Sequence, residues 1–370
     1  MIPVASPSIS RLETKFVTKA AKSSWVGSKG FYIDAATEAF KDVSGTNHVS
    51  LVSNGTVAIH LALLALEIKP GDEVIVPNFT YVAVANSVKY CGAVPIFCEV
   101  DPASWNLDFT KLKSLISRKT KAIIVVNTFG RIADYGSIRK ILNELQRNDI
   151  KIIEDASQSH MAQSNNINSG SFGDISTFSF FANKIITAGE GGAVCSNNEE
   201  FIFKVNLLKN QSLQPTNENY FYFPRLGFNY RLNNLSAAIL YAQILRRFEL
   251  KSKRQYIYEM YLDGLRNLES LSFQSNILTN DIAPWLFPVK LKPSAKLSRN
   301  QIILNLKDNG IETRPFFYPL NQLPEFKQEL SIEKGVSYDL AQNGINLPTF
   351  FNLTTRQIKK ITSDFSNLIH

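Results

Sequence analysis

Cysteines and long apolar runs are both scarce in this chain. Cys91, Cys98 and Cys195 are its three cysteines, and they form neither a disulfide framework nor a C-x-x-C pair. We therefore expect reduced, buried thiols, as in a cytosolic protein. No stretch approaches the roughly 18 consecutive apolar residues of a membrane span, and residues 1–6 lack the basic and apolar regions of a secretory signal. The sequence predicts a cytoplasmic location with no membrane partner.

Glycine, proline and charged residues are also modest in number. The 18 glycines and 15 prolines among 370 residues exclude a collagen-like or low-complexity chain. Hydrophobic residues make up 44% of the chain and charged residues 19%, which excludes intrinsic disorder. A chain of this length is expected to fold as about two to three domains and to bury a sizeable core.

Two cofactor signatures are missing. No G-x-G-x-x-G follows a predicted strand, which argues against a nicotinamide dehydrogenase. The four histidines and three cysteines are scattered, so we expect no metal site.

The net charge of +8 is modest for a chain of this length. The densest basic run of the chain, residues 246–254, is interpreted as a solvated helix face rather than a nucleic-acid site. The excess positive charge suits an anionic small molecule.

Apolar strands alternate with helices over about residues 48–155. The predicted strands are 48–53, 73–76, 94–100, 122–126 and 151–154, and the predicted helices between them are 57–66, 81–91 and 135–147. This α/β pattern predicts a mostly parallel sheet covered on both faces. Because such sheets bind ligands at the carboxyl ends of their strands, Asn54, Pro77, Asn127 and Asp155 are candidate site positions.

The pattern changes after about residue 240. A basic helix over 241–267, a strand over 286–291 and helices over 298–309 and 354–369 predict a smaller C-terminal α+β domain. We expect residues 1–245 to form an N-terminal arm and a large domain, and residues 246–370 to form the small one.

The first candidate site is the turn Ser53-Asn54-Gly55-Thr56, between a predicted strand and a predicted helix. Gly55 allows a ligand to approach the backbone closely, and the free N–H groups and dipole of the helix start favour a phosphate. Thr56 adds a hydroxyl. An ordinary helix-capping turn is the alternative interpretation.

The second and third candidates are single charged residues beside predicted strands. Asp155 ends a buried strand, where a carboxylate is costly unless a cation meets it. A protonated pyridine nitrogen is one such cation, and a structural helix cap is the alternative. Lys184 follows the aromatic segment 178–181, where desolvation lowers the pKa of an amine and makes it nucleophilic. A surface lysine is the alternative.

These features occur in one order: Gly-Thr at a helix start, Asp after a buried strand, and Lys about 30 residues later. That order resembles the fold type I pyridoxal 5'-phosphate (PLP) enzymes, and in detail the DegT-type sugar-nucleotide aminotransferases. The matching segments are 53–63, 70–77, 154–158, 170–174, 179–184, 189–192, 227–232 and 346–348. The resemblance extends from about Trp25 to Ile361. It implies the fold type I PLP-dependent transferase architecture, a large PLP-binding domain followed by a smaller α+β domain.

Residues 223–231 and 313–320 are most similar to the GDP-perosamine synthases of that family. The resemblance implies transfer of an amino group from L-glutamate to the C4 ketone of GDP-4-keto-6-deoxy-D-mannose, giving GDP-perosamine and 2-oxoglutarate. It also implies a homodimer or higher homo-oligomer, no nucleic-acid partner, and a role in O-antigen (lipopolysaccharide) biosynthesis.

The resemblance assigns roles to single residues. Lys184 is implied as the catalytic lysine that binds PLP and then moves a proton. Asp155 is implied to pair with the pyridine nitrogen and Gln158 with the phenolic oxygen of the ring. The other implied cofactor contacts are Gly55, Thr56 and Ser179 at the phosphate, Tyr81 over the ring, and Asn229, which reaches the phosphate of the other subunit. The implied substrate contacts are His160, Arg231, Arg314, Phe317 and Tyr318.

Alternatives stay open for several of these residues. Tyr81 fits a packed core aromatic equally well, Arg231 and Arg314 fit structural ion pairs, and His160 fits a structural histidine. Two segments depart from the family pattern. Residues 127–131 stand where relatives often carry a His- or Tyr-rich loop, and Asn321 stands where perosamine-type members often have His. These departures weaken the assignment of the substrate, not that of the cofactor.

Three rival functions remain at this stage. Some family members are dehydratases with His in place of the cofactor lysine, and Lys184 argues against that chemistry. Amination at C3, or of a dTDP- or UDP-linked keto sugar, stays open. A non-catalytic PLP- or sugar-binding regulator is hard to reconcile with the presence of both Lys184 and Asp155.

Overall fold

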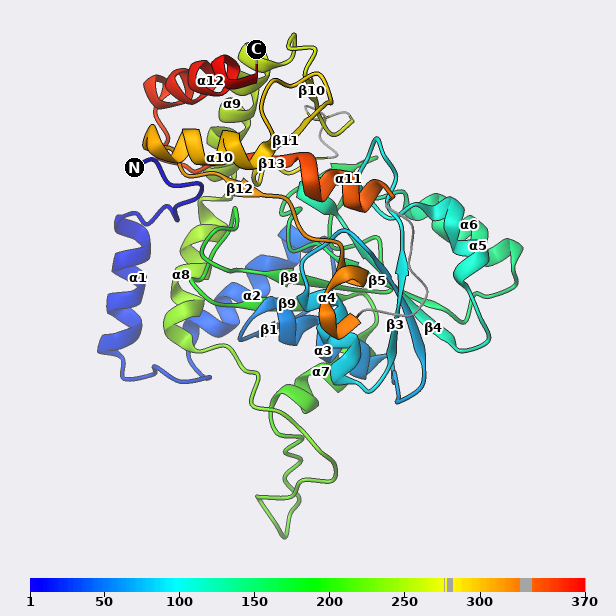
Figure 1. The fold of residues 1–370 in the computed structure, drawn as a ribbon. Coiled ribbons are helices and arrows are strands. Elements are labelled where there is room, and N and C mark those ends of the chain that lie inside the picture. Colours follow the sequence, from blue (N-terminus) through cyan, green and yellow to red (C-terminus); the bar gives the residue numbers. More distant parts are fainter. Residues whose placement is uncertain (276, 278–281, 327–334, 370) are drawn as a thin grey trace.

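A computed structural model describes residues 1–275, 277, 282–326 and 335–369 (Figure 1). Its larger sheet has seven strands in the order β1-β9-β8-β5-β4-β2-β3. These are β1 (His48–Val52), β2 (Glu73–Pro77), β3 (Val94–Cys98), β4 (Thr120–Val126), β5 (Lys151–Asp155), β8 (Ile175–Ser179) and β9 (Gly192–Ser196). β9 pairs antiparallel with both neighbours and the other pairings are parallel. The expected α/β fold with a mostly parallel sheet is confirmed.

Side chains of the strands alternate between two apolar cores, as the period of two in a strand requires. Ile123 and Ile152 join the core on one face, which is covered by α2 (Phe31–Ser44), α6 (Tyr135–Glu144) and α8 (Asn234–Leu245). Ile124 and Ile153 join the core on the other face, which is covered by α3 (Gly55–Ala65), α4 (Ala83–Tyr90) and α7 (Glu199–Lys209). Burial on both faces explains why the strands read as continuous apolar runs. A short helix, α5 (Leu112–Leu115), precedes β4, and β6 (Gln163–Ser164) pairs with β7 (Ile167–Asn168) in a small hairpin.

The chain after α8 builds a second unit with its own core. Its antiparallel sheet consists of β10 (Leu271–Ser272), β11 (Phe287–Leu291), β13 (Gly344–Leu347) and β12 (Arg314–Pro315), in that order. The helices of this unit are α9 (Arg247–Leu265), α10 (Arg299–Asp308), α11 (Val336–Asn343) and α12 (Thr355–Ile369). Figure 1 shows it above the large sheet. The expected division between residues 245 and 246 falls at the junction of α8 and α9.

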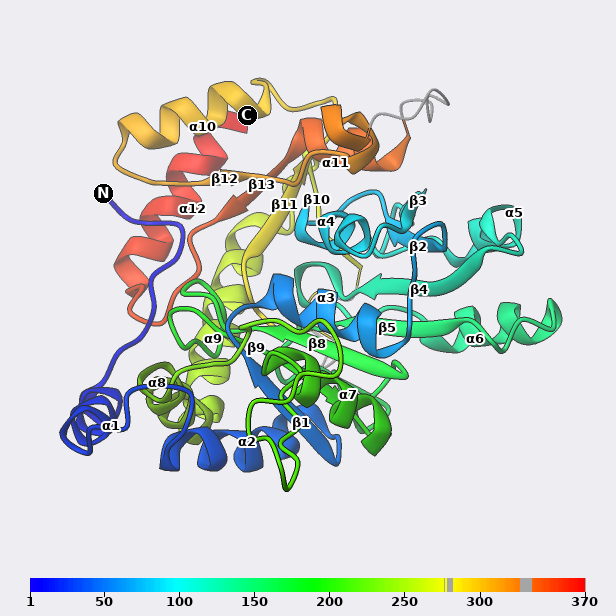
Figure 2. The same ribbon diagram turned by 90° about the horizontal axis from the view of Figure 1, so that it is seen from below.

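The N-terminal arm contacts both units. Helix α1 (Arg11–Lys22) lies beside α8, as Figures 1 and 2 show. The residues before α1 instead run along the second unit. The N–H of Ile2 donates to the carbonyl of Gly310 (2.7 Å), and that of Val4 to Oε2 of Glu312 (3.1 Å). The arm therefore ties the C-terminal unit to the large one.

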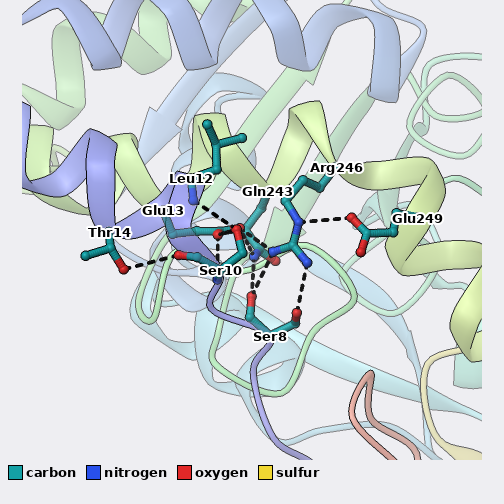
Figure 3. Close-up of polar contacts among 8 residues, drawn as sticks. All are labelled: Ser8, Ser10, Leu12, Glu13, Thr14, Gln243, Arg246 and Glu249. Atoms are coloured by element: carbon teal, nitrogen blue, oxygen red, sulfur yellow. Dashed lines mark hydrogen bonds and ion pairs between the residues drawn. The ribbon is translucent and has the colours of Figure 1, made fainter.

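The expectation of one basic helix over 241–267 is wrong. The helix is broken at Arg246, where ψ is 4°. The Arg246 guanidinium donates to Oε1 of Glu13 (2.7 Å) and to Oγ of Ser8 (3.1 Å), both in the N-terminal arm (Figure 3). The break lets α8 pack on the large sheet while α9 packs on the small one. The interpretation of 246–254 as a solvated face is wrong at both ends, because Arg246 is paired with Glu13 and Arg254 is buried.

The three cysteines are free and buried, as expected. In the described ranges, no helix combines the length and the apolar character needed to cross a membrane.

Candidate active site

The first part of the site is a close contact between the start of α3 and the end of β8. Asn54 caps α3 by accepting from the N–H of Val57 (3.0 Å). By the geometry of a helix start, the N–H groups of Gly55 and Thr56 have no partner inside the helix. A Cβ added at Gly55 would lie 2.8 Å from Cβ of Ser179, so the helix start meets the strand end with no room for a side chain. The turn predicted at 53–56 is thus a bare backbone cradle.

Asp155, which is buried, and Lys184, which is half-buried, lie close enough to affect each other's charge. Asp155 is the last residue of β5, and its Oδ1 accepts from the N–H of Ser157 (3.0 Å). Burial raises the pKa of Asp155, although hydrogen bonds from Ser157 and the positive field of Lys184 oppose the rise. Burial lowers the pKa of Lys184 to about 8, against the field of Asp155. Lys184 is half-buried and its Nζ lies 3.9 Å from the ring centroid of Trp285, so the interpretation as an ordinary surface lysine is wrong.

Gln158 is oriented by an unusual loop after β4. Its Oε1 accepts from the N–H of Phe129 (2.8 Å), which directs the Nε2 donor elsewhere. Phe129 is buried with φ 50° and ψ 28°, a left-handed conformation that is rare for a bulky residue and typical of functional sites. Phe317 stacks on Phe129 with ring centroids 5.6 Å apart and an angle of 7°. The ring of Tyr81 is next to that of Phe317, with ring centroids 6.4 Å apart.

Tyr81 is not a packed core aromatic, because it is 61% exposed. Tyr318 is also exposed, next to Phe317 in the chain. We refer to Tyr81, Tyr318 and the half-buried Phe317 as the aromatic rim.

The predicted arginine and asparagine contacts have polar partners of their own. Arg314, on the edge strand β12, lies 3.7 Å from Oε1 of Glu312 and is half exposed. Arg231 donates to Oδ1 of Asn229 and to Oδ1 of Asn210, both at 2.9 Å. The backbone of Arg231 pairs with Val52 at the end of β1, close in the chain to the cradle.

His160 lies in the core, and its contact with substrate stays a prediction. It is 1% exposed, and its Nδ1 accepts from the N–H of Ile186 (3.3 Å). Its ring packs against Phe178 and Phe180. Burial lowers its pKa to about 3, so it stays neutral. Its Nε2 is buried and has no hydrogen-bond partner among the described residues.

Asn127, which departs from the family pattern, holds neighbouring segments of the chain together. Its Nδ2 donates to Oε1 of Glu154 (2.9 Å), and its Oδ1 accepts from the N–H of Ala133 (3.1 Å) and from the Tyr135 hydroxyl (3.1 Å). These bonds anchor the loop that carries Phe129. Arg131, from the same loop, donates to the carbonyl of Ser275. Asn321 is placed by its N–H, which donates to Oδ1 of Asn78 (3.0 Å).

Two residues near Lys184 were missed by the sequence analysis. Trp285 lies under the amine, with Nζ of Lys184 3.9 Å from the ring centroid. Arg254 donates to the main chain of Lys184. A signal for Arg254 existed, because it shares the buried stripe of α9 with Leu250, Ile257 and Tyr258 at helical spacing.

Residues 7–366 match the model of the DegT/DnrJ/EryC1/StrS aminotransferase family. The chain belongs to this family. The aminotransferase is 38% identical over 369 residues to the GDP-perosamine synthase of Caulobacter vibrioides, covering 100% of this chain and 98% of that one. It is also 38% identical to the GDP-perosamine synthase of Vibrio cholerae, covering 99% of each chain. The PLP form of a putative sugar aminotransferase from Streptococcus pneumoniae shares the fold, with a TM-score of 0.93, 24% identity and coverage of 99% and 98%.

The aminotransferase is PLP-dependent, and its residues fit that cofactor. The backbone cradle at Gly55, where a Cβ would collide with Ser179, suits a phosphate group at a helix start. The raised pKa of Asp155 marks a buried carboxylate that a further cation would stabilise, as a protonated ring nitrogen does. Lys184 supplies an amine of lowered pKa beside it.

Proposed function

We propose that this enzyme transfers the amino group of L-glutamate to the C4 ketone of GDP-4-keto-6-deoxy-D-mannose, giving GDP-perosamine and 2-oxoglutarate. One observation carries the proposal: the chain is 38% identical to two GDP-perosamine synthases along almost the whole length of each. A third, from Escherichia coli O157:H7, is 35% identical over 357 residues.

Lys184 is the proposed acid–base residue. When bound, PLP supplies an electron sink that stabilises negative charge on the carbon next to the transferred nitrogen. In the first half-reaction, Nζ of Lys184 accepts the proton from the α-carbon of glutamate. In the second, it delivers a proton to C4 of the sugar. A pKa of about 8 leaves the amine able to do both near neutral pH, which is the condition for efficient general acid–base catalysis.

The remaining cofactor contacts follow from the geometry of the cradle. The N–H groups of Gly55 and Thr56, with the hydroxyls of Thr56 and Ser179, are the proposed phosphate ligands. Asp155 is the proposed partner of the ring nitrogen. Because Oε1 of Gln158 already accepts from Phe129, its Nε2 is the donor left for the phenolic oxygen of the ring.

The aromatic rim and two arginines are the proposed substrate contacts. Tyr81 is proposed to cover the cofactor ring, and Phe317 and Tyr318 to contact the sugar nucleotide. Arg231 and Arg314 carry the positive charge that a diphosphate requires, and a guanidinium can bind phosphate oxygens in pairs. Arg314 is half exposed, and its contact with Oε1 of Glu312 is long (3.7 Å), so it can exchange that partner for substrate.

We also propose that the enzyme is a homodimer in which Asn229 reaches the cofactor phosphate of the other subunit. The segment before Asn229 supports this proposal. It extends away from the body of the molecule (Figure 1) and exposes a run of large apolar side chains, namely Tyr220, Phe221, Tyr222, Phe223 and Leu226. An exposed apolar patch of this kind marks an interface. We further propose a cytoplasmic enzyme of O-antigen biosynthesis, divided into domains at residues 1–245 and 246–370.

A substrate panel tests the proposed function. GDP-, dTDP- and UDP-linked 4-keto-6-deoxy sugars and a UDP-linked 3-keto sugar are each incubated with enzyme, PLP and L-glutamate, and amino sugars are detected by mass spectrometry. We expect amination of the GDP sugar alone, and its loss in Lys184→Ala. Amination of only a dTDP or UDP sugar would refute the substrate but keep the chemistry. Cofactor absorbance without turnover on any sugar would favour a binding protein.

A further inference from the structure

Arg254 is a buried cation without a carboxylate partner in the part of the chain that the structure describes. It lies on α9 and is 3% exposed. Its NH1 donates to the carbonyls of Trp285 (2.7 Å) and Thr349 (3.1 Å), and its NH2 to the carbonyl of Lys184 (3.5 Å). A buried charge costs several kcal/mol unless polar groups surround it. Three main-chain carbonyls from separate segments do so here, and one belongs to the cofactor lysine.

Trp285 makes the second connection to the same loop. Its Nε1 donates to the carbonyl of Asn183 (2.9 Å), and its ring face lies under the Lys184 amine. A cation over the face of an indole is attracted by the quadrupole of the ring. Two adjacent residues of the lysine loop, 183 and 184, are therefore held through their carbonyls by side chains of the C-terminal unit. The carbonyl of Trp285 is itself bound by Arg254, which closes the set of contacts.

We propose that Arg254 and Trp285 are positioning residues for Lys184: Arg254 fixes the main chain of the lysine loop, and Trp285 supports the amine whenever it is not joined to the cofactor. This inference rests on the proposed role of Lys184. Neither residue has to touch substrate. The charged or titratable groups around Lys184 among the described residues are Asp155 on β5, His160 in the following loop and Arg254 on α9.

The test measures Lys184 itself in the protein without PLP. Acetic anhydride pulses over a range of pH, followed by mass spectrometry of the peptide that contains Lys184, give the pH midpoint of its reactivity. Trp285→Leu removes the ring, and with it the cation–π contact that favours the charged amine. The midpoint should therefore fall by about 0.5 to 1 pH unit, the pKa shift that corresponds to such a contact. Trp285→Phe keeps a weaker ring and should shift it less. A second readout is the glutamate half-reaction, whose rate should fall at least tenfold in Trp285→Leu.

Arg254→Lys separates position from charge. It keeps the positive charge but loses the planar fork that reaches several carbonyls at once. If Arg254 acts by positioning, this variant should also lower the Lys184 midpoint, because the amine moves away from the Trp285 ring and from Asp155. Arg299→Lys is the matched control. Arg299, on α10, likewise donates to carbonyls, those of Ala341 (3.0 Å) and Gly344 (3.4 Å), and this variant should leave the midpoint unchanged.

The inference is overturned if Trp285→Leu and Arg254→Lys both keep the wild-type midpoint, or if Arg299→Lys shifts it equally. Thermal melting checks that each variant is folded. If Arg254→Lys fails to fold, the two Trp285 variants decide. The midpoint of Trp285→Phe should then lie between that of the wild type and that of Trp285→Leu. A failure of the proposed function looks different. In that case PLP would not protect wild-type Lys184 from acetylation, whatever the variants do.

Discussion

The polar network that joins the N-terminal arm to the α8–α9 junction allows a quantitative prediction. Glu13 is 1% exposed and accepts from Ser10 N (2.7 Å), Gln243 Nε2 (2.7 Å) and Arg246 NH1 (2.7 Å) (Figure 3). Glu13→Gln keeps the shape but removes the charge, and it turns an amide donor toward some of these donors. Removing one partner of a buried ion pair costs about 3–5 kcal/mol. Because Arg246 keeps its contacts with Glu249 and Ser8, we expect the free energy of unfolding to fall by about 3 kcal/mol, the lower end of that range.

Urea unfolding at pH 7, followed by tryptophan fluorescence, measures this loss. Glu249→Gln is the matched control, because Glu249 pairs with the same arginine (3.1 Å) but its side chain is 55% exposed. An exposed pair contributes about 0–1 kcal/mol, so this control should unfold almost like the wild type. Equal losses in the two variants would refute the argument from burial.

The same network predicts a dependence on pH. Burial alone would raise the pKa of Glu13, but hydrogen bonds from Ser10 and Arg246 outweigh it, so the folded pKa lies below the ordinary value of 4.5. A carboxyl whose pKa is lowered by folding stabilises the protein above its unfolded pKa and loses that effect as the pH falls through the folded value. The gap between wild type and Glu13→Gln should therefore be constant from pH 7 to 5 and shrink below 4.5. A gap that grows in acid would contradict the assignment.

Three further predictions concern the site. Gly55→Ala puts a Cβ 2.8 Å from that of Ser179, and such overpacking costs about 1–3 kcal/mol. The Kd for PLP, measured by absorbance titration, should therefore rise about 5- to 150-fold. An unchanged Kd would speak against the cradle. The negative field of Asp155 raises the pKa of Lys184, so Asp155→Asn should lower it. The pH midpoint for acetylation of Lys184 should then fall below the wild-type value of about 8. A higher midpoint would be inconsistent with the pairing of the two residues. In the wild type, the rate constant of the half-reaction at saturating glutamate should rise with pH toward a plateau above about 8, because Lys184 is a free amine only after glutamate has replaced it on the cofactor and accepts a proton only when neutral. A flat profile from about pH 6 to 9 would exclude it as the base.

Local sequence patterns were enough to predict strands β1 to β5 of the large sheet and the turn at residues 53–56, but not the antiparallel strand β9. The strands of a doubly covered sheet are continuous apolar runs, and Gly55-Thr56 at a helix start is a short-range signal. The resemblance added the order of Gly55, Asp155 and Lys184, which could not have been ranked above their structural alternatives one at a time.

Long-range contacts explain most of what the sequence could not predict. The break at Arg246 depends on Glu13, which lies 233 positions away, and the anchor of Lys184 depends on Arg254, 70 positions away. A basic run gives no sign that two of its arginines point inward. Likewise, a polar residue at a strand end can face a ligand, as we propose for Asp155, or satisfy a loop, as Asn127 does. Periodicity does not distinguish these two cases.

The contacts of the N-terminal arm also set an order for folding. Val4 bonds to Glu312 across 308 positions, and Ile2 to Gly310 at a similar separation. During synthesis the arm leaves the ribosome long before residues 310–312 are made, and pairings of such separation form slowly. These contacts can therefore form only after most of the C-terminal unit has been made. A protein trimmed of its first residues would retain every candidate site side chain but lose contacts that only a nearly finished chain can form.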